Sequence, residues 1–475
     1  MSSSRTASAA TGPLAGLRII DMSTVLAAPL AGQVLADYGA DVIKVEPPGG
    51  DVFRHAGAKR SPLMGPVFMH ANRNKRSAVI DARDPRGRDA ILRLCRGAHG
   101  FLHNIRPSAM ARLGLAYEDV ARVSPAVVYL SLVGYGSKGC YAGRPAYDDL
   151  IQGFGGLAAT FTMSGADEPR FVPMVIADRL AGLSAAHAML AALVHQQRTG
   201  EGQQVEVPMF ESLVQMVLGD HLGGLSFEPA AGPKGYARLT TRNRRPYRTR
   251  DGYICVLVYT DRQWQKFFEA IGRRDIWESD PRFADQATRA QHYDDAYAML
   301  AGFLLERSTA QWLELLHACD LPAVPVSEIE DLIDDPHLRG SGFLQAVEHP
   351  TEGRMLQIGV PQAFSGTPAN IHRHAPSPGE QSREVLAEAG FTVDEIDALV
   401  NAGIVDAGAG GGSGDGGGSG DGPGDGAAGL PASAALRRGD HARPSPPSPP
   451  STLPGPVSAP DEGVRGGPDP HGKEP

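Results

Sequence analysis

Asp178 is an isolated acidic residue between an apolar run and a long segment rich in alanine and leucine, in the stretch FVPMVIADRLAGLSAAHAMLAALVHQQRTGEG. The spacing of the apolar residues predicts a helix with Arg198 in its last turn and Gly200 as its stop signal. We predict Asp178 as the N-cap, where a carboxylate accepts hydrogen bonds from free backbone N–H groups. The simplest interpretation is that this acid only caps the helix. A carboxylate at the positive end of a helix dipole also stays ionised, so Asp178 is a candidate nucleophile.

Other catalytic and cofactor motifs are missing from the sequence. No GxGxxG follows the first predicted strand, and neither GxxxxGK[ST] nor HExxH occurs. The four cysteines lie far apart and form no CxxC pair; they are Cys95, Cys140, Cys255 and Cys319. We therefore predict no metal site, no disulfide framework and no tightly bound cofactor.

The composition favours a soluble, cytoplasmic protein. The chain has 475 residues, 42% of them hydrophobic, and a formal net charge of −9. This acidic balance argues against nucleic acid as a partner, because phosphate binding needs a basic face. No apolar stretch approaches the roughly 18 uninterrupted residues of a membrane span. We therefore expect no membrane partner and no signal peptide.

Strands and helices alternate from Leu17 onward. Strand-like patterns occupy residues 17–23, 40–48, 77–83, 100–105 and 126–136, and helical patterns occupy residues 29–39, 84–98 and 109–123. Asp84 is the predicted N-cap of the second of these helices, with Pro85 at its first position. The alternation predicts an α/β fold with an open, mostly parallel sheet that is covered by helices on both faces.

The alternation weakens near residue 226, where proline, glycine and a dense group of arginines appear. We place a domain boundary there and predict a smaller α+β domain at residues 226–330. Residues 1–12 precede the first regular pattern and are predicted to be flexible. Residues 405–475 are rich in Gly, Pro, Ser and Asp and lack the apolar content that would offset the entropy of ordering, so we predict a disordered tail.

Several segments together are similar to one known family. They are PLAGLRIIDMSTVLAAPLAGQVLADYGADVIKVEPPGGD, NRNKRSAVIDARDPRG, HNIRPSAMARLGL, RPAYDDLIQGFGGL, RTGEGQQVEVPMFES and DPHLRGSGFLQAVEHPTEGRMLQIGVP. In this order they resemble the class III CoA-transferases, the CaiB/BaiF or formyl-CoA transferase family. The resemblance extends from residue 13 to about residue 404.

The resemblance implies more about the fold than the patterns alone predict. It implies a Rossmann-like large domain whose parallel sheet is built from the CoA-binding residues 13–225 and completed by a return segment, residues 331–404. It also implies a homodimer in which the two subunits are interlocked like links of a chain.

The same resemblance implies that Asp178 is the nucleophile of a CoA-transferase. Such an enzyme moves CoA between an acyl-CoA thioester and a small free carboxylic acid, through an aspartyl anhydride and an aspartyl-CoA thioester. Tyr147 and Asp148 are expected at the thioester end of the pocket. The positions that match the family's CoA site are Leu26, Ala27, Asp81, Ala82, Arg83, Asn104, Ile105, Arg106 and Arg112.

One departure from the family concerns the CoA phosphates. Relatives that use an arginine just after the second strand have it where this chain has Pro47. Phosphate groups need fixed positive charge, so another cation has to supply the contact. The candidates are Arg54, Arg73, Lys75 and Arg76.

Two other functions are alternatives at this point. Racemases of the same family shift the proton on the carbon next to the thioester, with a histidine from a GHD segment as a base. Here that segment reads RPAYDD, so Tyr147 replaces the histidine, and tyrosine is a poor base near neutral pH. Transfer is therefore favoured over racemisation. The second alternative is a CoA-binding protein without catalysis, in which Asp178 is inert.

The acids that exchange CoA are less well indicated. The segment YARLTTRNRRPYRTRDGY contains six arginines, Arg238, Arg242, Arg244, Arg245, Arg248 and Arg250. Such a group either forms a solvated or partner-binding face or recognises a second carboxylate through bidentate bonds, which would favour a small dicarboxylic acid. The glycine-rich loop of formyl-CoA transferase has no counterpart here, which argues against oxalate and formate as substrates.

Overall fold

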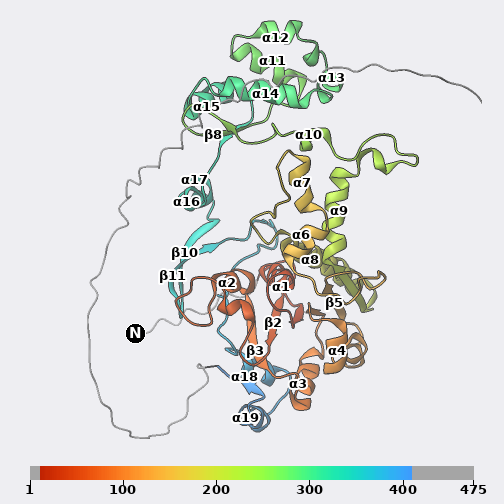
Figure 1. Ribbon diagram of the computed structural model, residues 1–475. Helices are drawn as coiled ribbons and strands as arrows, with labels where there is room; N and C mark the ends of the chain where they lie inside the picture. Colours follow the sequence, from red (N-terminus) through yellow and green to blue (C-terminus); the bar gives the residue numbers. More distant parts are fainter. Residues whose placement is uncertain (1–10, 409–475) are drawn as a thin grey trace, which may run out of the picture. The chain divides into compact units, whose positions relative to one another are not determined.

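A seven-stranded sheet is the centre of the computed structural model, which describes residues 11–408 (Figure 1). The strand order is β12-β3-β2-β1-β4-β5-β6, and all neighbours pair in parallel except β12, which is antiparallel to β3. The strands are β1 (Arg18–Asp21), β2 (Asp41–Glu46), β3 (Lys75–Ile80), β4 (Gly100–His103), β5 (Val128–Val133), β6 (Gln203–Pro208) and β12 (Val405–Asp406). The predicted mostly parallel sheet is confirmed. We call the part of the chain built on it the large domain.

Successive strands are added on opposite sides of β1. β2 and β3 lie on one side, and β4, β5 and β6 lie on the other. The strand order therefore reverses between β1 and β4. In open α/β sheets, ligands bind outside the carboxyl ends of the strands at such a switch point.

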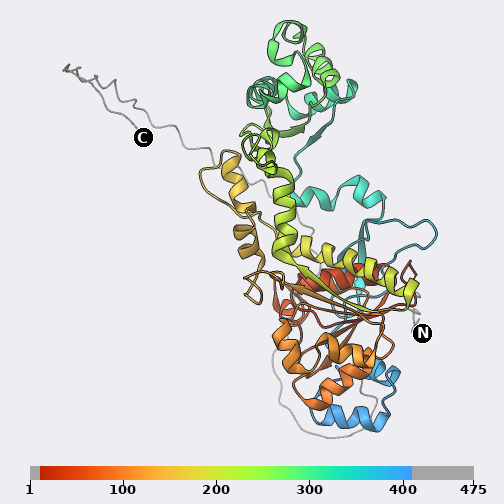
Figure 2. The same cartoon turned by 90° about the vertical axis from the view of Figure 1, so that its right-hand side faces the viewer.

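Helices cover both faces of this sheet (Figure 2). Buried apolar side chains accordingly form two clusters, one on each face. The first face is covered by α1 (Ala27–Asp37), α8 (Ile176–Thr199) and α9 (Met209–His221). The second face is covered by α3 (Pro85–Cys95), α4 (Pro107–Leu113), α5 (Tyr117–Val123), α18 (Ser382–Glu388) and α19 (Val393–Asn401). Three shorter helices of the same part of the chain are α2 (Pro66–Asn72), α6 (Asp148–Phe154) and α7 (Leu157–Met163).

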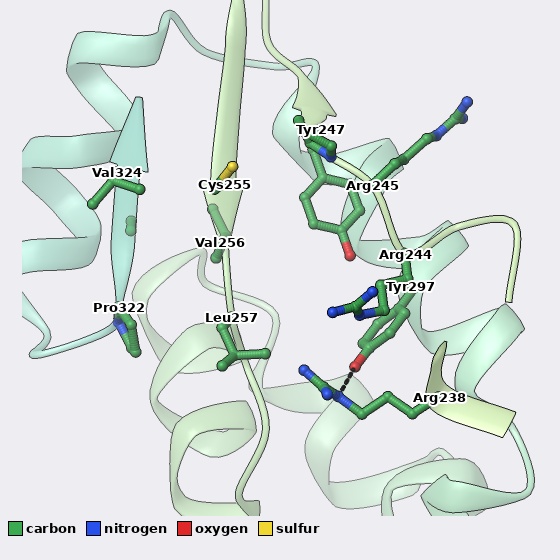
Figure 3. Close-up of a pocket in the computed structure, with 12 residues that line it drawn as sticks. Arg238, Arg244, Arg245, Tyr247, Cys255, Val256, Leu257, Tyr297, Pro322 and Val324 are labelled. Atoms are coloured by element: carbon green, nitrogen blue, oxygen red, sulfur yellow. Dashed lines mark hydrogen bonds between the residues drawn. The ribbon is translucent and has the colours of Figure 1, made fainter. Parts of the chain in front are cut away.

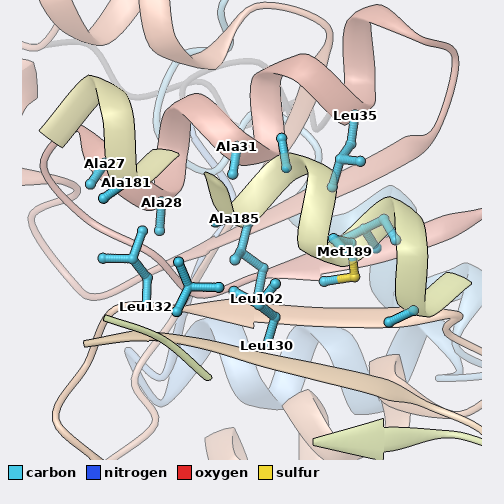
Figure 4. Packing of buried hydrophobic residues seen from close by; sticks show 14 of the residues in the cluster. Ala27, Ala28, Ala31, Leu35, Leu102, Leu130, Leu132, Ala181, Ala185 and Met189 are labelled. Atoms are coloured by element: carbon cyan, nitrogen blue, oxygen red, sulfur yellow. The ribbon is translucent and has the colours of Figure 1, made fainter. Parts of the chain in front are cut away.

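Small side chains let α8 approach α1 closely (Figure 4). Ala28 of α1 and Ala185 of α8 are fully buried in the cluster between these helices and the sheet. At Gly182, a β-carbon would lie only 2.4 Å from the backbone oxygen of Ala27. α8 is long and apolar enough to cross a membrane by length and composition, but its packing on α1 and the sheet accounts for that character as a core helix. The contact fixes the first turns of α8 against the start of α1.

The residues of the predicted smaller domain form a core of their own. Trp264, Phe267 and Trp312 are almost completely buried in it. An antiparallel sheet in the order β7-β8-β9 is made by β7 (Tyr247–Arg248), β8 (Tyr253–Val256) and β9 (Ala323–Pro325). The helices are α10 (Ala237–Thr240), α11 (Asp261–Ala270), α12 (Arg274–Ser279), α13 (Gln286–Ala290), α14 (Tyr293–Leu304) and α15 (Thr309–Ala318). We call this part the small domain; its limits at residues 226 and 330 stay a prediction.

The chain that follows the small domain packs back on the large-domain sheet. It contains α16 (Ile329–Ile333), α17 (Pro336–Gly340) and a hairpin of β10 (Leu344–His349) and β11 (Gly353–Ile358) before α18, α19 and β12. Arg76 of β3 forms ion pairs of 2.8 Å with Glu384 and Glu388 of α18. The backbone N–H of Ser77 donates to the side chain of Gln381 at 2.9 Å.

Two sequence predictions need correction, and two concern residues that the structure does not describe. Residues 109–123 form two helices rather than one, because Gly114 takes a left-handed conformation with φ of 67° that ends α4. The predicted tail begins too early, since Val405 and Asp406 are strand β12. The predictions for residues 1–10 and 409–475 fall outside the described residues. Asp84 does cap α3, where its side chain accepts from the N–H of Arg86.

Because of the close contact at Gly182, we expect substitution by alanine to destabilise α8 rather than to stabilise it. In a helix interior alanine normally stabilises by about 0.5–1 kcal/mol relative to glycine. Gly182→Ala should instead lower the free energy of unfolding by about 1–3 kcal/mol, because its β-carbon meets backbone. Gly302→Ala in α14 is the matched control, since nothing lies within 4 Å of the added carbon. Urea unfolding measures both changes, and equal responses would contradict the close approach of α1 and α8.

The position of β12 predicts that two nearly identical truncations differ in stability. A chain that ends at Ile404 lacks β12, whereas a chain that ends at Gly408 keeps it. Val405 is 2% exposed and pairs with Ile80 of β3. We expect the shorter chain to be less stable by about 2 kcal/mol, mainly through the lost burial of valine. Thermal unfolding of the two chains at equal concentration tests this, and equal stability would show that β12 adds nothing.

Candidate active site

A cavity of about 520 Å³ lies at the carboxyl ends of β1, β4, β5 and β6. Its walls are formed by the residues that follow these strands, by the loop 134–147 and by the first turns of α1 and α8. This is the edge of the sheet, and the switch point, at which a ligand is expected.

Two side chains fix the turn that follows β1, which forms one wall. The side-chain amide of Asn104 accepts from the N–H of Thr24 at 2.9 Å and donates to the carbonyl oxygen of Thr24 at 2.8 Å. The carboxylate of Asp51 accepts from the N–H of Val25 at 3.1 Å. Val25 has a φ of 71°, which is costly for a β-branched residue. These bonds therefore hold a strained turn that leads directly into α1, where Ala27 lines the cavity.

Buried ion pairs lie beneath this turn. Nζ of Lys75 is 2.8 Å from Asp21, and Nζ of Lys44 is 3.0 Å from Asp51; all four side chains are completely buried. Lys44 also donates to the carbonyl oxygen of Ser23 at 2.8 Å. Burial alone would raise the pKa of Asp21, but Lys75 and Lys44 hold that pKa below its usual value. These contacts anchor the turn to β2 and β3.

Asp178 is the third residue of α8 and not the N-cap, which corrects the prediction. The N-cap is Val175, whose side chain makes no capping bond. The N–H of Asp178 donates instead to Oδ1 of Asp148, at 3.0 Å. The helix end thus receives its carboxylate from α6, and the carboxylate of Asp178 itself lines the cavity.

Asp148 is part of a network that joins three segments. It is buried at the start of α6, and its Oδ2 accepts from Nε2 of Gln152 at 2.7 Å. Oε1 of Gln152 accepts from the N–H of Val172 at 2.9 Å, and its Nε2 donates to the carbonyl oxygen of Met174 at 3.2 Å. The network ties α6 and the segment before α8 together, and so fixes the backbone that carries Asp178.

The pKa of Asp178 is raised from 3.8 to about 6. Burial is the main cause, the negative charge of Asp148 is the second, and Arg179 opposes both. The N-terminus of α8 was expected to stabilise the ionised form of Asp178, but burial and the charge of Asp148 outweigh that effect. At neutral pH the carboxylate is still mostly ionised, and its higher basicity makes it a better nucleophile than an ordinary aspartate.

Comparison with known proteins decides the family. Residues 14–382 match the model of CoA-transferase family III. The chain belongs to this family. It is a class III CoA-transferase, and the resemblance inferred from the sequence is confirmed.

The relatives of this transferase match over nearly their whole length. A probable fatty acyl-CoA transferase of Mycobacterium tuberculosis is 31% identical over 387 residues, which are 79% of this chain and 98% of the relative. The succinate–glutarate CoA-transferase of Agrobacterium fabrum is 32% identical over 392 residues, 79% of this chain and 95% of the relative. A crystal structure of the mycobacterial protein, in an orthorhombic form, gives a TM-score of 0.68 at 30% identity and covers 78% of this chain and 99% of that one.

Half of the twelve residues predicted for catalysis and for CoA or substrate binding line the cavity of the transferase. They are Ala27, Asn104, Ile105, Arg106, Tyr147 and Asp178. Leu26 is buried behind the turn after β1, and Asp148 supports Asp178 from α6. Among residues 11–408, no group of three or more His, Cys, Asp or Glu side chains is placed to hold a metal ion.

The other predicted positions lie elsewhere on the large domain. Asp81, Ala82 and Arg83 follow β3, and the guanidinium of Arg83 donates to the carboxylate of Asp81 at 2.8 Å. Arg112 is exposed in the last turn of α4. None of these four lines the cavity, and their role in CoA binding stays a prediction.

The four cations considered for the CoA phosphates have structural partners instead. All four are buried and none lines the cavity. The pairs are Arg54 with Glu46 at 2.7 Å, Arg73 with Asp37 at 2.8 Å, Lys75 with Asp21 at 2.8 Å and Arg76 with Asp41 at 2.7 Å. A role in phosphate binding is therefore not supported for any of them.

The sequence analysis missed polar residues of the loop 134–147. Arg144 lines the cavity and stands in the segment RPAYDD, so an arginine next to Tyr147 in a quoted motif was an available signal. Ser137 also lines the cavity, and its N–H donates to the carboxylate of Glu206 on β6 at 2.9 Å. Nothing in the sequence signals this last contact, because it depends on how β6 pairs with β5.

The raised pKa of Asp178 predicts the pH dependence of transfer. The rate kcat/KM should fall as pH drops through about 6, because the protonated acid is not a nucleophile. Asp148→Asn removes the neighbouring charge, so the acidic limb should move to lower pH. Asp149→Asn makes the same change at an exposed neighbour and should leave the limb in place. Profiles between about pH 4.5 and 8 test this; a limb that moves equally in both variants, or in neither, would contradict the assignment.

Proposed function

We propose that this transferase moves CoA between an acyl-CoA thioester and a free carboxylic acid through covalent attachment to Asp178. The observation that supports the proposal is the carboxylate of Asp178, with a pKa of about 6, in the wall of a cavity at the switch point of the sheet. Burial and a neighbouring charge raise pKa values at many active sites, and here both act on the residue that family resemblance selects.

The proposed sequence has four balanced steps. The Asp178 carboxylate attacks the thioester carbonyl, a mixed anhydride forms and the CoA thiolate leaves. The thiolate then attacks the aspartyl carbonyl of the anhydride, which releases the donor acid and leaves CoA as an aspartyl thioester. The acceptor carboxylate attacks that thioester to form a second anhydride and free thiolate. The thiolate finally attacks the acceptor acyl carbon, which gives the new acyl-CoA and restores Asp178.

The oxyanion of each tetrahedral state needs hydrogen-bond donors, and two of the N–H groups at the start of α8 are already engaged. The N–H of Asp178 is used by Asp148, and the N–H of Ile176 donates to the carbonyl oxygen of Met174 at 2.8 Å. The start of α1 lines the cavity through Ala27 and has no side-chain cap or acidic residue in its first turn. Its free N–H groups are therefore the better donors.

Positive charge for the anionic substrates comes from two arginines of the cavity wall, Arg106 and Arg144. We propose that one of them pairs with a distal carboxylate, so that the acid partner is a small dicarboxylic acid. The Agrobacterium relative is named for succinate and glutarate, which agrees with this choice. The mycobacterial relative is named as a probable fatty acyl-CoA transferase, which leaves a monocarboxylic partner as the second candidate.

Racemisation is the alternative chemistry, and the cavity gives it little support. It needs a base that removes the proton next to the thioester. Among the described residues that line this cavity there is no histidine. Tyr147, which stands in its place in the sequence, is 68% exposed.

The interlocked homodimer also remains a proposal. Exposed apolar side chains on α8 and α9 support a partner surface on the large domain; they are Leu183, Val194, Met216 and Leu218. Light scattering of the full chain measures the mass in solution directly.

Covalent labelling tests the nucleophile. Trypsin cleaves after Arg170 and Arg179, so Asp178 is the only acid in the peptide 171–179. After incubation with an acyl-CoA, hydroxylamine should convert the aspartyl intermediate in that peptide to a hydroxamate. Asp178→Asn should abolish both the label and the transfer. Transfer by wild-type protein without any label in this peptide would refute the covalent route.

The same variant has an expected effect on stability. The folded protein binds a proton at Asp178 up to about pH 6, whereas the unfolded chain loses it near the reference pKa of 3.8. The contribution of this group to stability is thus present at acid pH and is lost as pH rises through about 6. At pH near 8, Asp178→Asn should therefore be as stable as the wild type or more stable. A marked loss of stability there would show that the ionised carboxylate supports the fold.

A further inference from the structure

Part of the arginine group noted in the sequence surrounds a second cavity, in the small domain (Figure 3). This cavity has a volume of about 450 Å³ and lies against β7, β8, β9 and α14. Three of the six arginines line it, Arg238, Arg244 and Arg245, and none of the six lines the cavity of Asp178. The group is therefore neither a uniformly solvated face nor a wall of the cavity that holds the nucleophile.

Two of the three arginines reach into this second cavity. In Figure 3 the guanidinium ends of Arg238 and Arg244 lie on the same side and point toward Leu257, whereas that of Arg245 points away. Nε of Arg238 donates to the hydroxyl oxygen of Tyr297 at 3.1 Å, which holds the side chain in place. The two guanidinium groups thus form one positive end of the cavity.

This positive end has no acidic partner among the described residues. The neighbours that act on the charge of Arg238 are tyrosines, and the charges of all three arginines act on the buried Tyr247. Arg76 in the large domain, by contrast, has three carboxylate partners within 2.8 Å. Both positive charges face the same cavity, and an anion placed between them would lower the electrostatic energy.

The opposite wall is apolar. It is formed by β8, β9 and the residues beside them, with Val256 and Ala323 buried at its base. Leu257 and Val324 remain 42% and 58% exposed at its surface. Covering them would remove apolar area from water, which is favourable.

We propose that this cavity binds a small monocarboxylate with an apolar body, the carboxylate between Arg238 and Arg244 and the hydrocarbon against Leu257 and Val324. An anionic head satisfies the two guanidinium groups, and a hydrocarbon tail covers the apolar wall. A dicarboxylate of the same length fits less well, because its second charge would meet an apolar surface that offers no hydrogen bond. The site requires neither CoA nor Asp178.

Calorimetric titration of the full-length protein tests the proposal, with hexanoate as the probe and CoA absent. Hexanamide has the same length without the charge, and adipate has the same length with a second charge. We expect hexanoate to bind at least about ten-fold more tightly than either. Arg244→Ala should weaken hexanoate binding by about ten-fold, whereas Arg245→Ala, the matched control that points away, should change it by less than about two-fold.

Two cysteines locate the bound acid. Cys255 is exposed and lines this cavity, whereas Cys140 is exposed and lines neither cavity. Hexanoate should slow the alkylation of Cys255 by iodoacetamide and leave that of Cys140 unchanged, as followed by mass spectrometry of the peptides. The result would overturn the proposal if Cys255 were not protected, if hexanamide bound as well as hexanoate, or if Arg244→Ala bound hexanoate like the wild type.

Transfer kinetics of the same variants show whether the bound acid is the acid substrate. A higher KM for the acid in CoA transfer by Arg244→Ala, with kcat unchanged, would identify the bound molecule as the acid substrate. An unchanged KM together with weakened binding would identify it as an acid that binds apart from catalysis. Both outcomes support the site. Because binding is measured without CoA, a failure of the covalent route through Asp178 leaves this test unaffected.

Discussion

Buried ion pairs that link β1, β2 and β3 hold the turn on which the candidate active-site cavity is built. Asp21, Lys75, Lys44 and Asp51 are completely buried. The attraction between the opposite charges offsets the free-energy cost of removing them from water only while every partner stays in place. Asp51 uses the same carboxylate to hold the strained Val25. The position of the first turn of α1 therefore depends on charges in the core of the sheet, and so does everything packed on α1. α8 lies against α1 without room for a β-carbon at Gly182, which transmits that position to the turn that carries Asp178.

Asp148 connects this scaffold to the chemistry. Its carboxylate accepts a hydrogen bond from the N–H of Asp178, as an N-cap side chain would, although Asp148 belongs to a neighbouring helix. The same negative charge, together with burial, raises the pKa of the Asp178 side chain. One residue thus places the backbone of the proposed nucleophile and adds to the effect of burial on its basicity. Stability at the start of α8 and reactivity at Asp178 are coupled for that reason, as expected of an active site that is arranged for its reaction rather than for stability.

Local patterns in the sequence predicted the order and type of most elements of the large domain. The alternating strands and helices from Leu17 onward, and the Asp84–Pro85 start of α3, depend on neighbouring residues and could be recognised from them. The N-cap assignment of Asp178 was wrong because the capping carboxylate stands 30 positions earlier in the chain.

Contacts between residues far apart in the chain were hardest to predict for the charged side chains. Arg54 and Lys75 carry the positive charge that a phosphate ligand needs, but they are buried against the carboxylates of Glu46 on β2 and Asp21 on β1. Arg238, Arg244 and Arg245 belong to the same arginine group and line the same cavity, yet only the guanidinium ends of Arg238 and Arg244 point toward Leu257. The sequence shows which residues are charged, whereas the fold decides which groups they contact.

The placement of the nucleophile in the first turn, rather than at the N-cap, follows from the exchange that the proposed route requires. In that route Asp178 must attack a thioester as a carboxylate and must later leave as a carboxylate when the thiolate attacks the acceptor acyl carbon of the second anhydride, so its basicity has to be comparable to that of the acids it exchanges. A true N-cap carboxylate accepts bonds from the helix N–H groups, which stabilise the ion and lower its basicity. With Asp148 taking those bonds, Asp178 keeps a pKa of about 6, somewhat above an ordinary carboxylic acid and still below neutrality. It is then ionised when it attacks and basic enough to attack well, and the CoA thiolate, which is more basic than any carboxylate, displaces it in the reverse direction.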